Sequence, residues 1–115
     1  MRLVELRLYR IRAGFAETFE RAMRLDALPL LRAAGHDVVA FGRSDRALEA
    51  WCLIRAYANK AHLQEQQDAF YASPQWKEGP RARILSCIED YQNALLALPE
   101  HAIDAMRTSL ILRSE

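Results

Sequence analysis

The sequence lacks an excess of charge of either sign, and this absence excludes several classes of partner. Lysine and arginine number 16 against 15 acidic residues, so the net charge is +1 at pH 7. Because the two signs are interspersed along the chain, we expect no binding surface for nucleic acid or for an anionic membrane. No apolar run approaches the roughly 20 residues of a membrane span, and the first residues lack the apolar core of a signal peptide. We therefore expect a cytoplasmic location.

Cysteine, histidine and glycine-rich motifs are sparse, which argues against a metal or a bound cofactor. Cys52 and Cys87 lie far apart in apolar segments, without metal-ligand spacing, and are expected to be buried thiols. His36, His62 and His101 form no two-histidine pattern on one face of a helix or strand. The glycine loops of nucleotide sites and the motifs of zinc proteases and serine hydrolases are missing. We expect neither a metal site nor a cofactor.

What the sequence does contain is a segment that is apolar on both of its alternating faces. Successive side chains of a strand point to opposite faces of the sheet. In Ala50–Tyr57, one face carries Trp51, Leu53, Arg55 and Tyr57, and the other carries Ala50, Cys52, Ile54 and Ala56. Such a strand needs a helix layer on one side and a further cover on the other. In a chain of 115 residues we expect that cover to be a second copy of the chain.

Hydrophobic periodicity predicts four strands and two helices in the order βαββαβ. This order is that of a ferredoxin-like α+β fold, in which a four-stranded antiparallel sheet carries both helices on one face. The first and third strands lie at the centre, and the bare apolar face pairs with a second copy to form a homodimeric α+β barrel. Pro29 is expected to kink or split the first helix. The strands are expected over residues 2–12, 36–43, Ala50–Tyr57 and Ile88–Leu98, and the helices over residues 15–34 and 59–71.

The domain is expected to end with the fourth strand, so that it spans residues 1–98. Residues 99–115 follow as a tail whose apolar side chains include Ile103, Met106 and Leu110. We expect a helix over residues 99–106 that docks on the domain or on the dimer mate. The pattern that orders the strands does not place this tail in the core.

Arg55 is the sharpest candidate for a functional side chain. A guanidinium keeps its charge, so a buried one must pair with a carboxylate or face a wet cavity. The available carboxylates are Glu5 on the first strand and Glu89 or Asp90 on the fourth. One interpretation is a structural ion pair inside the sheet or the dimer interface. The other is a grip on an anionic or carbonyl-bearing ligand.

Residues 70–81 form a second candidate region, because they are rich in aromatic side chains and helix breakers. Such a segment plugs the gap between helix and sheet, or it forms the wall of a ligand pocket. Arg7 and Tyr9 share a face of the first strand with Glu5 and belong to the same question. The candidate ligand-binding residues are Tyr9, His36, Arg55, Tyr57, Tyr71, Trp76 and Arg81.

Four segments resemble the NIPSNAP family. They are Val4-Glu5-Leu6-Arg7-Leu8-Tyr9, Leu28-Pro29-Leu30-Leu31, Arg55-Ala56-Tyr57, and the block from Phe70-Tyr71 to Trp76, in that order. The resemblance spans about residues 4–98 and implies a ferredoxin-like fold in the dimeric α+β barrel superfamily, with a homodimer and no agreed catalytic residues. Many members carry tryptophan where Arg55 stands, often with histidine where Leu53 stands, and this chain departs from the family there.

Three functions are open for these residues, and the sequence does not choose among them. The first is a homodimeric domain that binds a small organic ligand, supported by the absence of a nucleophile with an adjacent base. The alternative is a cofactor-free monooxygenase or isomerase acting on a hydrophobic or aromatic substrate, in which the candidate residues polarise a carbonyl or stabilise an enolate. Haem binding is a third option within the superfamily, with His62 as the one eligible axial ligand.

Overall fold

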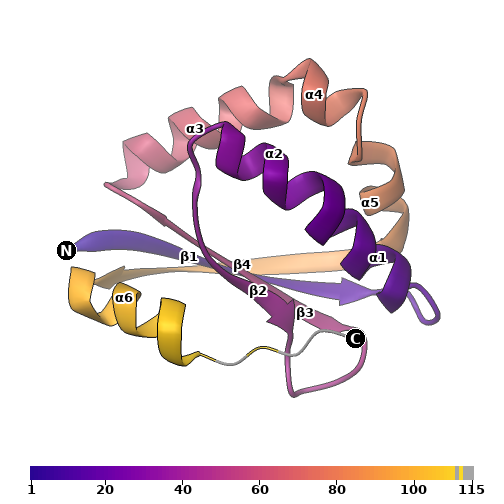
Figure 1. Ribbon diagram of the computed structural model, residues 1–115, viewed down its shortest axis with the longest axis horizontal. Coiled ribbons are helices and arrows are strands. Elements are labelled where there is room, and N and C mark those ends of the chain that lie inside the picture. The colour runs from indigo at the N-terminus through magenta and orange to yellow at the C-terminus, as the bar shows by residue number, and fades with distance from the viewer. Residues whose placement is uncertain (111, 113–115) are drawn as a thin grey trace.

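The computed structural model describes residues 1–110 and 112, and its centre is a four-stranded antiparallel sheet. The strand order is β2-β3-β1-β4, so β1 and β3 are central. Helices α1 to α5 cover one face, called the inner face here, and α6 lies against the opposite, outer face (Figure 1). The predicted ferredoxin-like α+β fold is thereby confirmed. The strands are β1 (Arg2–Ile11), β2 (Asp37–Arg43), β3 (Ala50–Tyr57) and β4 (Ile88–Leu98).

The first helical segment is divided into three parts where one helix was predicted. An α-helical part, α1 (Ala16–Ala22), leads through a π-helical turn, η1 (Met23–Ala27), into α2 (Leu28–Ala33). Pro29 lies in the first turn of α2. Because proline has no N–H and its ring clashes with the carbonyl four residues earlier, the preceding turn is wider than an α-helical turn. The predicted break at Pro29 therefore takes the form of a π-turn before it.

Side-chain caps start the first two helices of the second helical segment. Asn59 accepts a hydrogen bond from the backbone N–H of His62 at 2.8 Å, which starts α3 (Lys60–Ala72). Ser73 accepts one from Trp76 N–H at 3.3 Å, which starts the short α4 (Pro74–Lys77). After a turn, α5 (Arg81–Cys87) leads directly into β4. These breaks divide the second helical segment into three helices, α3, α4 and α5.

Aromatic rings fill the core between the helices and the inner face. Phe19 of α1 is fully buried, and its ring centroid lies 5.2 Å from that of Tyr9 and 6.0 Å from that of Trp51. Phe41 stacks on Trp51 at 5.6 Å. Each buried aromatic side chain contributes roughly 1.5–3 kcal/mol of transfer free energy, so this cluster is a main source of stability.

The outer face is covered at one end by α6 (Glu100–Ser109). Ile103 has 0% exposure and packs with Val4, Ile54 and Ala56. Arg107 forms two hydrogen bonds of 2.6 Å with Asp37 at the start of β2. The helix of the predicted tail thus docks on its own domain, and positions 111 and 113–115 of that tail lie outside the described residues.

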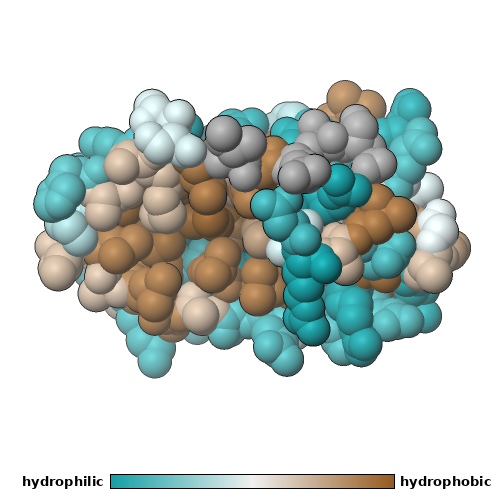
Figure 2. Space-filling view, turned by 90° about the horizontal axis from the view of Figure 1, so that it is seen from below, coloured by the Kyte–Doolittle hydropathy of each residue, from teal (hydrophilic) through white to brown (hydrophobic). Residues whose placement is uncertain are grey.

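Away from α6 the outer face is apolar and open. Leu8 of β1 and Leu96 of β4 are 42% and 45% exposed. Apolar side chains gather on this underside of the molecule (Figure 2). Within residues 1–110 and 112, none of the helices has the length and apolar character that a membrane span requires. The cytoplasmic location stays a prediction.

Candidate functional site

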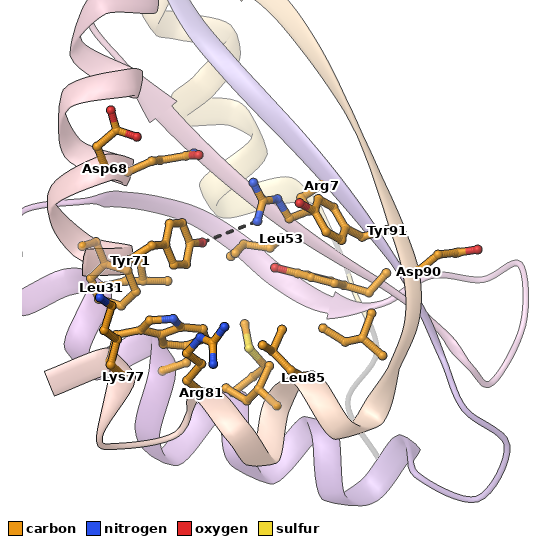
Figure 3. Close-up of a pocket in the computed structure, with 18 of the residues that line it drawn as sticks. Arg7, Leu31, Leu53, Asp68, Tyr71, Lys77, Arg81, Leu85, Asp90 and Tyr91 are labelled. Atoms are coloured by element: carbon orange, nitrogen blue, oxygen red, sulfur yellow. Dashed lines mark hydrogen bonds between the residues drawn. The ribbon is translucent and has the colours of Figure 1, made fainter. Parts of the chain in front are cut away.

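A groove with a volume of about 1060 Å³ opens on the inner face of the sheet (Figure 3). It exists because the helix layer leaves the edge strand β4 largely uncovered, and nearly every residue of that strand is exposed. Strands β1, β3 and β4 form one side, and the helical segments from η1 to α5 form the other. The apolar part of the lining includes Met23, Leu31, Leu53, Phe70, Trp76, Ile84 and Leu85.

The structure separates the seven predicted site residues into two groups. Four of them line the groove: Tyr9, Tyr71, Trp76 and Arg81. The other three, Arg55, His36 and Tyr57, lie in a buried hydrogen-bond network that adjoins the groove without being part of its lining.

Arg55 is buried and paired with Glu5. Their exposed fractions are 0% and 1%, and Arg55 donates from Nε at 3.1 Å and from Nη2 at 2.6 Å to Glu5 Oε1. The strand register places these two residues opposite each other on β1 and β3. The other two carboxylates proposed as partners, Glu89 and Asp90, bind Arg10 instead. Arg55 therefore forms a structural ion pair with Glu5, as in the first interpretation.

Glu5 also accepts hydrogen bonds from three further side chains. Arg7 Nη2 donates to Glu5 Oε2 at 3.0 Å, Gln67 donates to Oε1 at 2.9 Å, and Asn93 donates to Oε2 at 3.1 Å. Burial works against the ionised carboxylate, but the adjacent Arg55 and Arg7 charges hold the pKa of Glu5 below its usual value. One carboxylate thus holds two guanidinium groups in place.

Tyr71 connects this network to the groove. Its hydroxyl oxygen accepts hydrogen bonds from Arg55 Nη1 at 3.0 Å and from Arg7 Nη1 at 3.5 Å, and Figure 3 shows the second of these contacts. The Arg7 guanidinium lies 4.8 Å from the ring centroid of Tyr91, a cation–π arrangement. Arg7 and Tyr71, together with Gln67, are the polar groups of this network that line the groove, whereas Arg55 does not line it.

Arg7 and Tyr91 line the groove but were not among the predicted site residues. Strand alternation places Arg7 on the face shared by Glu5 and Tyr9, and this signal was available. Tyr91 lies opposite Tyr9 in the register of β1 and β4. Tyr91 lines the groove because of that register and because β4 is left uncovered. Strand alternation predicts neither of these.

His36 and Tyr57 lie at the far side of the network. His36 Nδ1 is 2.9 Å from the Tyr57 hydroxyl, which also accepts a hydrogen bond from Gln67 at 3.2 Å. Burial, together with the Arg55 charge, lowers the pKa of His36 to about 4, so this imidazole is neutral at pH 7. Burial also raises the pKa of the Tyr57 phenol.

His62, the residue eligible as a haem ligand, has a local structural role. Its Nδ1 accepts a hydrogen bond from the backbone N–H of Ala58 at 2.9 Å, next to the cap of α3. It is not among the residues that line the groove. Among residues 1–110 and 112, no three histidine, cysteine, aspartate or glutamate side chains are grouped so as to hold a metal ion.

Comparison with known proteins gives matches at the level of structure. No protein-family model matches the chain, and no curated protein matches it significantly. An uncharacterised NIPSNAP domain protein from Burkholderia xenovorans superposes with a TM-score of 0.76 at 25% identity, covering 85% of this chain and 95% of that one. A NIPSNAP family protein from Agrobacterium tumefaciens gives a TM-score of 0.78 at 20% identity, with 87% and 95% covered.

A third match widens the set of similar folds. A Bordetella bronchiseptica protein to which the name antibiotic biosynthesis monooxygenase has been attributed gives a TM-score of 0.65 at 19% identity, covering 85% of this chain and 97% of that one. At this identity the likeness concerns the fold alone. The NIPSNAP proteins superpose more closely and over nearly their whole length. The resemblance to the NIPSNAP family predicted from the sequence is thereby confirmed, and the chain has the fold of a NIPSNAP domain.

Proposed function

We propose that the protein binds a small organic ligand with an apolar body in the groove. The observation that carries this proposal is the groove itself, with its volume of about 1060 Å³, its apolar walls and a few polar groups at one place. Small-molecule sites are concave, mostly apolar and supplied with a small number of positioned polar groups. The Tyr91 ring and the Leu85 side chain, 54% and 45% exposed, offer surfaces on which a ring can pack.

Binding is favoured over catalysis by the state of the acidic groups in the groove lining. Asp68 accepts a hydrogen bond from Gln64 at 2.8 Å, and Glu89 and Asp90 form ion pairs with Arg10. A cofactor-free monooxygenase or isomerase needs a base that reaches the substrate. The described lining residues include no histidine that could serve as that base.

The proposal is tested with N-phenyl-1-naphthylamine, a neutral probe whose fluorescence rises in apolar surroundings. We expect saturable binding, and we expect Leu85→Asp to weaken it about fivefold, because a half-exposed apolar wall residue is replaced by a charge. Leu25→Asp is the matched control, since Leu25 is an exposed helical leucine outside the groove. Equal weakening by both variants, or no saturable binding by the parent protein, would contradict the proposal.

For the assembly, we propose a homodimer formed through the open part of the outer face. Leu8 and Leu96 lie there on adjacent strands with more than 40% of their surfaces exposed. Contiguous exposed apolar surface of this kind is typical of an interface. Light scattering at micromolar concentration should give twice the mass of 13.2 kDa, and the double variant Leu8→Lys/Leu96→Lys should give the monomer mass. A monomeric parent protein would overturn this proposal without affecting the first.

A further inference from the structure

Building on the proposed function of the groove, we infer that it selects ring-bearing organic anions, with a carboxylate-type oxygen held by Tyr71 and Arg7. This inference names the class of ligand. It rests on the hydrogen bonds that the Tyr71 hydroxyl can still make and on the excess of positive charge around it. Both are found at one place in the groove, beside the buried pair of Glu5 and Arg55.

The Tyr71 hydroxyl has a proton that neither neighbouring arginine can accept. A phenol hydroxyl has two lone-pair directions and one O–H. Guanidinium groups approach the Tyr71 oxygen from Arg55 at 3.0 Å and from Arg7 at 3.5 Å, and both can only donate. The O–H must therefore point away from both arginines. Tyr71 lines the groove, and no described residue accepts a hydrogen bond from its hydroxyl, so this donor is available to a ligand.

The network of Arg55, Arg7 and Glu5 carries more positive than negative charge. Arg55 and Arg7 share the single carboxylate of Glu5, which leaves one positive charge uncompensated within this network. Arg7 Nε is buried and has no hydrogen-bond partner within the described part of the chain. A buried donor without an acceptor has a free-energy cost that an incoming acceptor removes. A negative oxygen bound beside the Arg7 guanidinium would compensate the excess charge.

The acidic residues of the groove do not supply that oxygen. Glu89 and Asp90 form ion pairs with Arg10. Figure 3 shows the Asp68 carboxylate turned away from the contact between Arg7 and Tyr71. Lys77 and Arg81 add two further positive charges to the lining and form no ion pair within residues 1–110 and 112. The location beside Tyr71 is therefore positive, although the whole chain is close to neutral.

The surroundings of Tyr71 can also hold the apolar body of a ligand. Aromatic side chains surround the same location: the Tyr71 ring lies 5.4 Å from the Trp76 ring, and Tyr91 lies under the Arg7 guanidinium. A planar ring can pack on these faces while its acidic substituent reaches Tyr71 and Arg7. The available Tyr71 O–H, the excess positive charge and the aromatic surroundings together favour an aromatic or similar ring-bearing carboxylate over a neutral ligand of equal size.

The test compares two compounds with the same ring system, 2-naphthoate and neutral 2-methylnaphthalene, as competitors of N-phenyl-1-naphthylamine. We expect 2-naphthoate to displace the probe at a concentration at least tenfold lower. Tyr71→Phe should reduce this ratio to about threefold or less, with the 2-methylnaphthalene value unchanged. Tyr57→Phe, the same change at a buried hydroxyl outside the groove, should keep the parent ratio.

The outcomes separate this inference from the proposed function. Equal displacement by the two compounds would overturn the selection of anions while leaving the groove as a binding site. Absence of probe binding would overturn the proposed function itself. An unchanged ratio in a Tyr71→Phe protein with the parent circular dichroism spectrum would overturn the assignment of Tyr71. If that variant fails to fold, the ratio measured on the parent protein still decides whether the groove selects anions.

Discussion

The two faces of the sheet differ in the kind of side chain that they bury. The inner face buries two charged residues, Glu5 and Arg55, in a polar network that adjoins the aromatic core, and each has its hydrogen-bonding partners. The outer face contains apolar residues under α6, held around Ile103, and leaves Leu8 and Leu96 open. Stability of the inner face therefore depends on complementary charge as well as on its aromatic core, whereas that of the outer face depends on how much apolar surface is covered.

This contrast also explains where a ligand can bind. Hydrogen-bonding side chains lie on the inner face, and the uncovered strand β4 leaves a groove beside them. The outer face offers apolar area with few directional groups, which suits a large flat partner better than a small molecule. Substitutions on each face therefore test this difference between the two faces.

The largest effect is expected from Glu5→Gln on the inner face. Removal of the carboxylate leaves the buried Arg55 and its neighbour Arg7 without a counter-charge. Loss of one partner from a buried ion pair costs about 3–5 kcal/mol in the free energy of unfolding, measured by urea denaturation. Glu100→Gln, which removes the exposed partner of Arg2 at 3.3 Å, is the control and should cost less than about 1 kcal/mol. Similar losses in both variants would refute the distinct role of Glu5.

A somewhat smaller effect is expected from Ile103→Ala on the outer face. Ile103 is fully buried beneath α6, so the substitution removes methyl groups and leaves a cavity. The expected loss is about 2–4 kcal/mol in the same urea experiment. His101→Ala, at an exposed position of the same helix, should change the stability by less than about 0.5 kcal/mol. A loss below 1 kcal/mol for Ile103→Ala would show that α6 does not cover this face in solution.

The third prediction concerns the pH dependence that His36 adds to the inner face. Its pKa is lowered to about 4 in the folded protein, against about 6.5 in the unfolded chain. As the pH falls below about 6.5 the unfolded chain binds a proton that the folded protein does not, so stability decreases until the pH reaches about 4. The contribution lost between pH 7 and pH 5 is about 2 kcal/mol.

Substitution isolates this contribution. In His36→Gln, the difference in unfolding free energy between pH 7 and pH 5 should be smaller than in the parent protein by about that 2 kcal/mol. The carboxylates are common to both proteins, so their titration cancels in the comparison. The same pH dependence in the two proteins would mean that His36 titrates normally.

The smallest effect is expected from Arg107→Gln, which breaks the ion pair that fastens α6 to β2. Arg107 and Asp37 are each about 30% exposed, and their contact is 2.6 Å. The hydrogen bonds from Arg107 lower the pKa of Asp37. Solvent screening limits the pair to less than about 1 kcal/mol, and the difference between variant and parent should shrink in 0.5 M NaCl. A larger, salt-independent loss would indicate that Arg107 acts through packing.

Much of the inner face could be predicted from alternation within strands. Glu5, Arg7 and Tyr9 were expected on one face of the first strand, and they lie there together. Three carboxylates remained as partners for Arg55, because alternation contains no information on register. In the folded protein the register sets Glu5 opposite Arg55 and Asp90 opposite Arg10, which decides the pairing.

The groove was predicted less completely than the network beneath it. Tyr71 and Trp76 were expected near a pocket because the segment around them combines aromatics with helix breakers. The roles of Arg7 and Tyr91 depended on β4 being left open by the helix layer, and that depends on where α3, α4 and α5 turn. The docking of α6 likewise depended on a fit between Ile103 and side chains of three strands.

The amino-acid sequence alone predicts the order of the strands and of the helical segments between them and the residues that share each face. It also predicts that a buried arginine must be paired with a carboxylate or solvated. These properties follow from spacings of a few residues and from the chemistry of single side chains. The packing of the folded chain sets which carboxylate meets Arg55, where α6 lies and which wall of the groove is polar. Those outcomes rest on the mutual fit of segments far apart in the chain, such as β1 with β4 and β2 with α6, which no local pattern specifies.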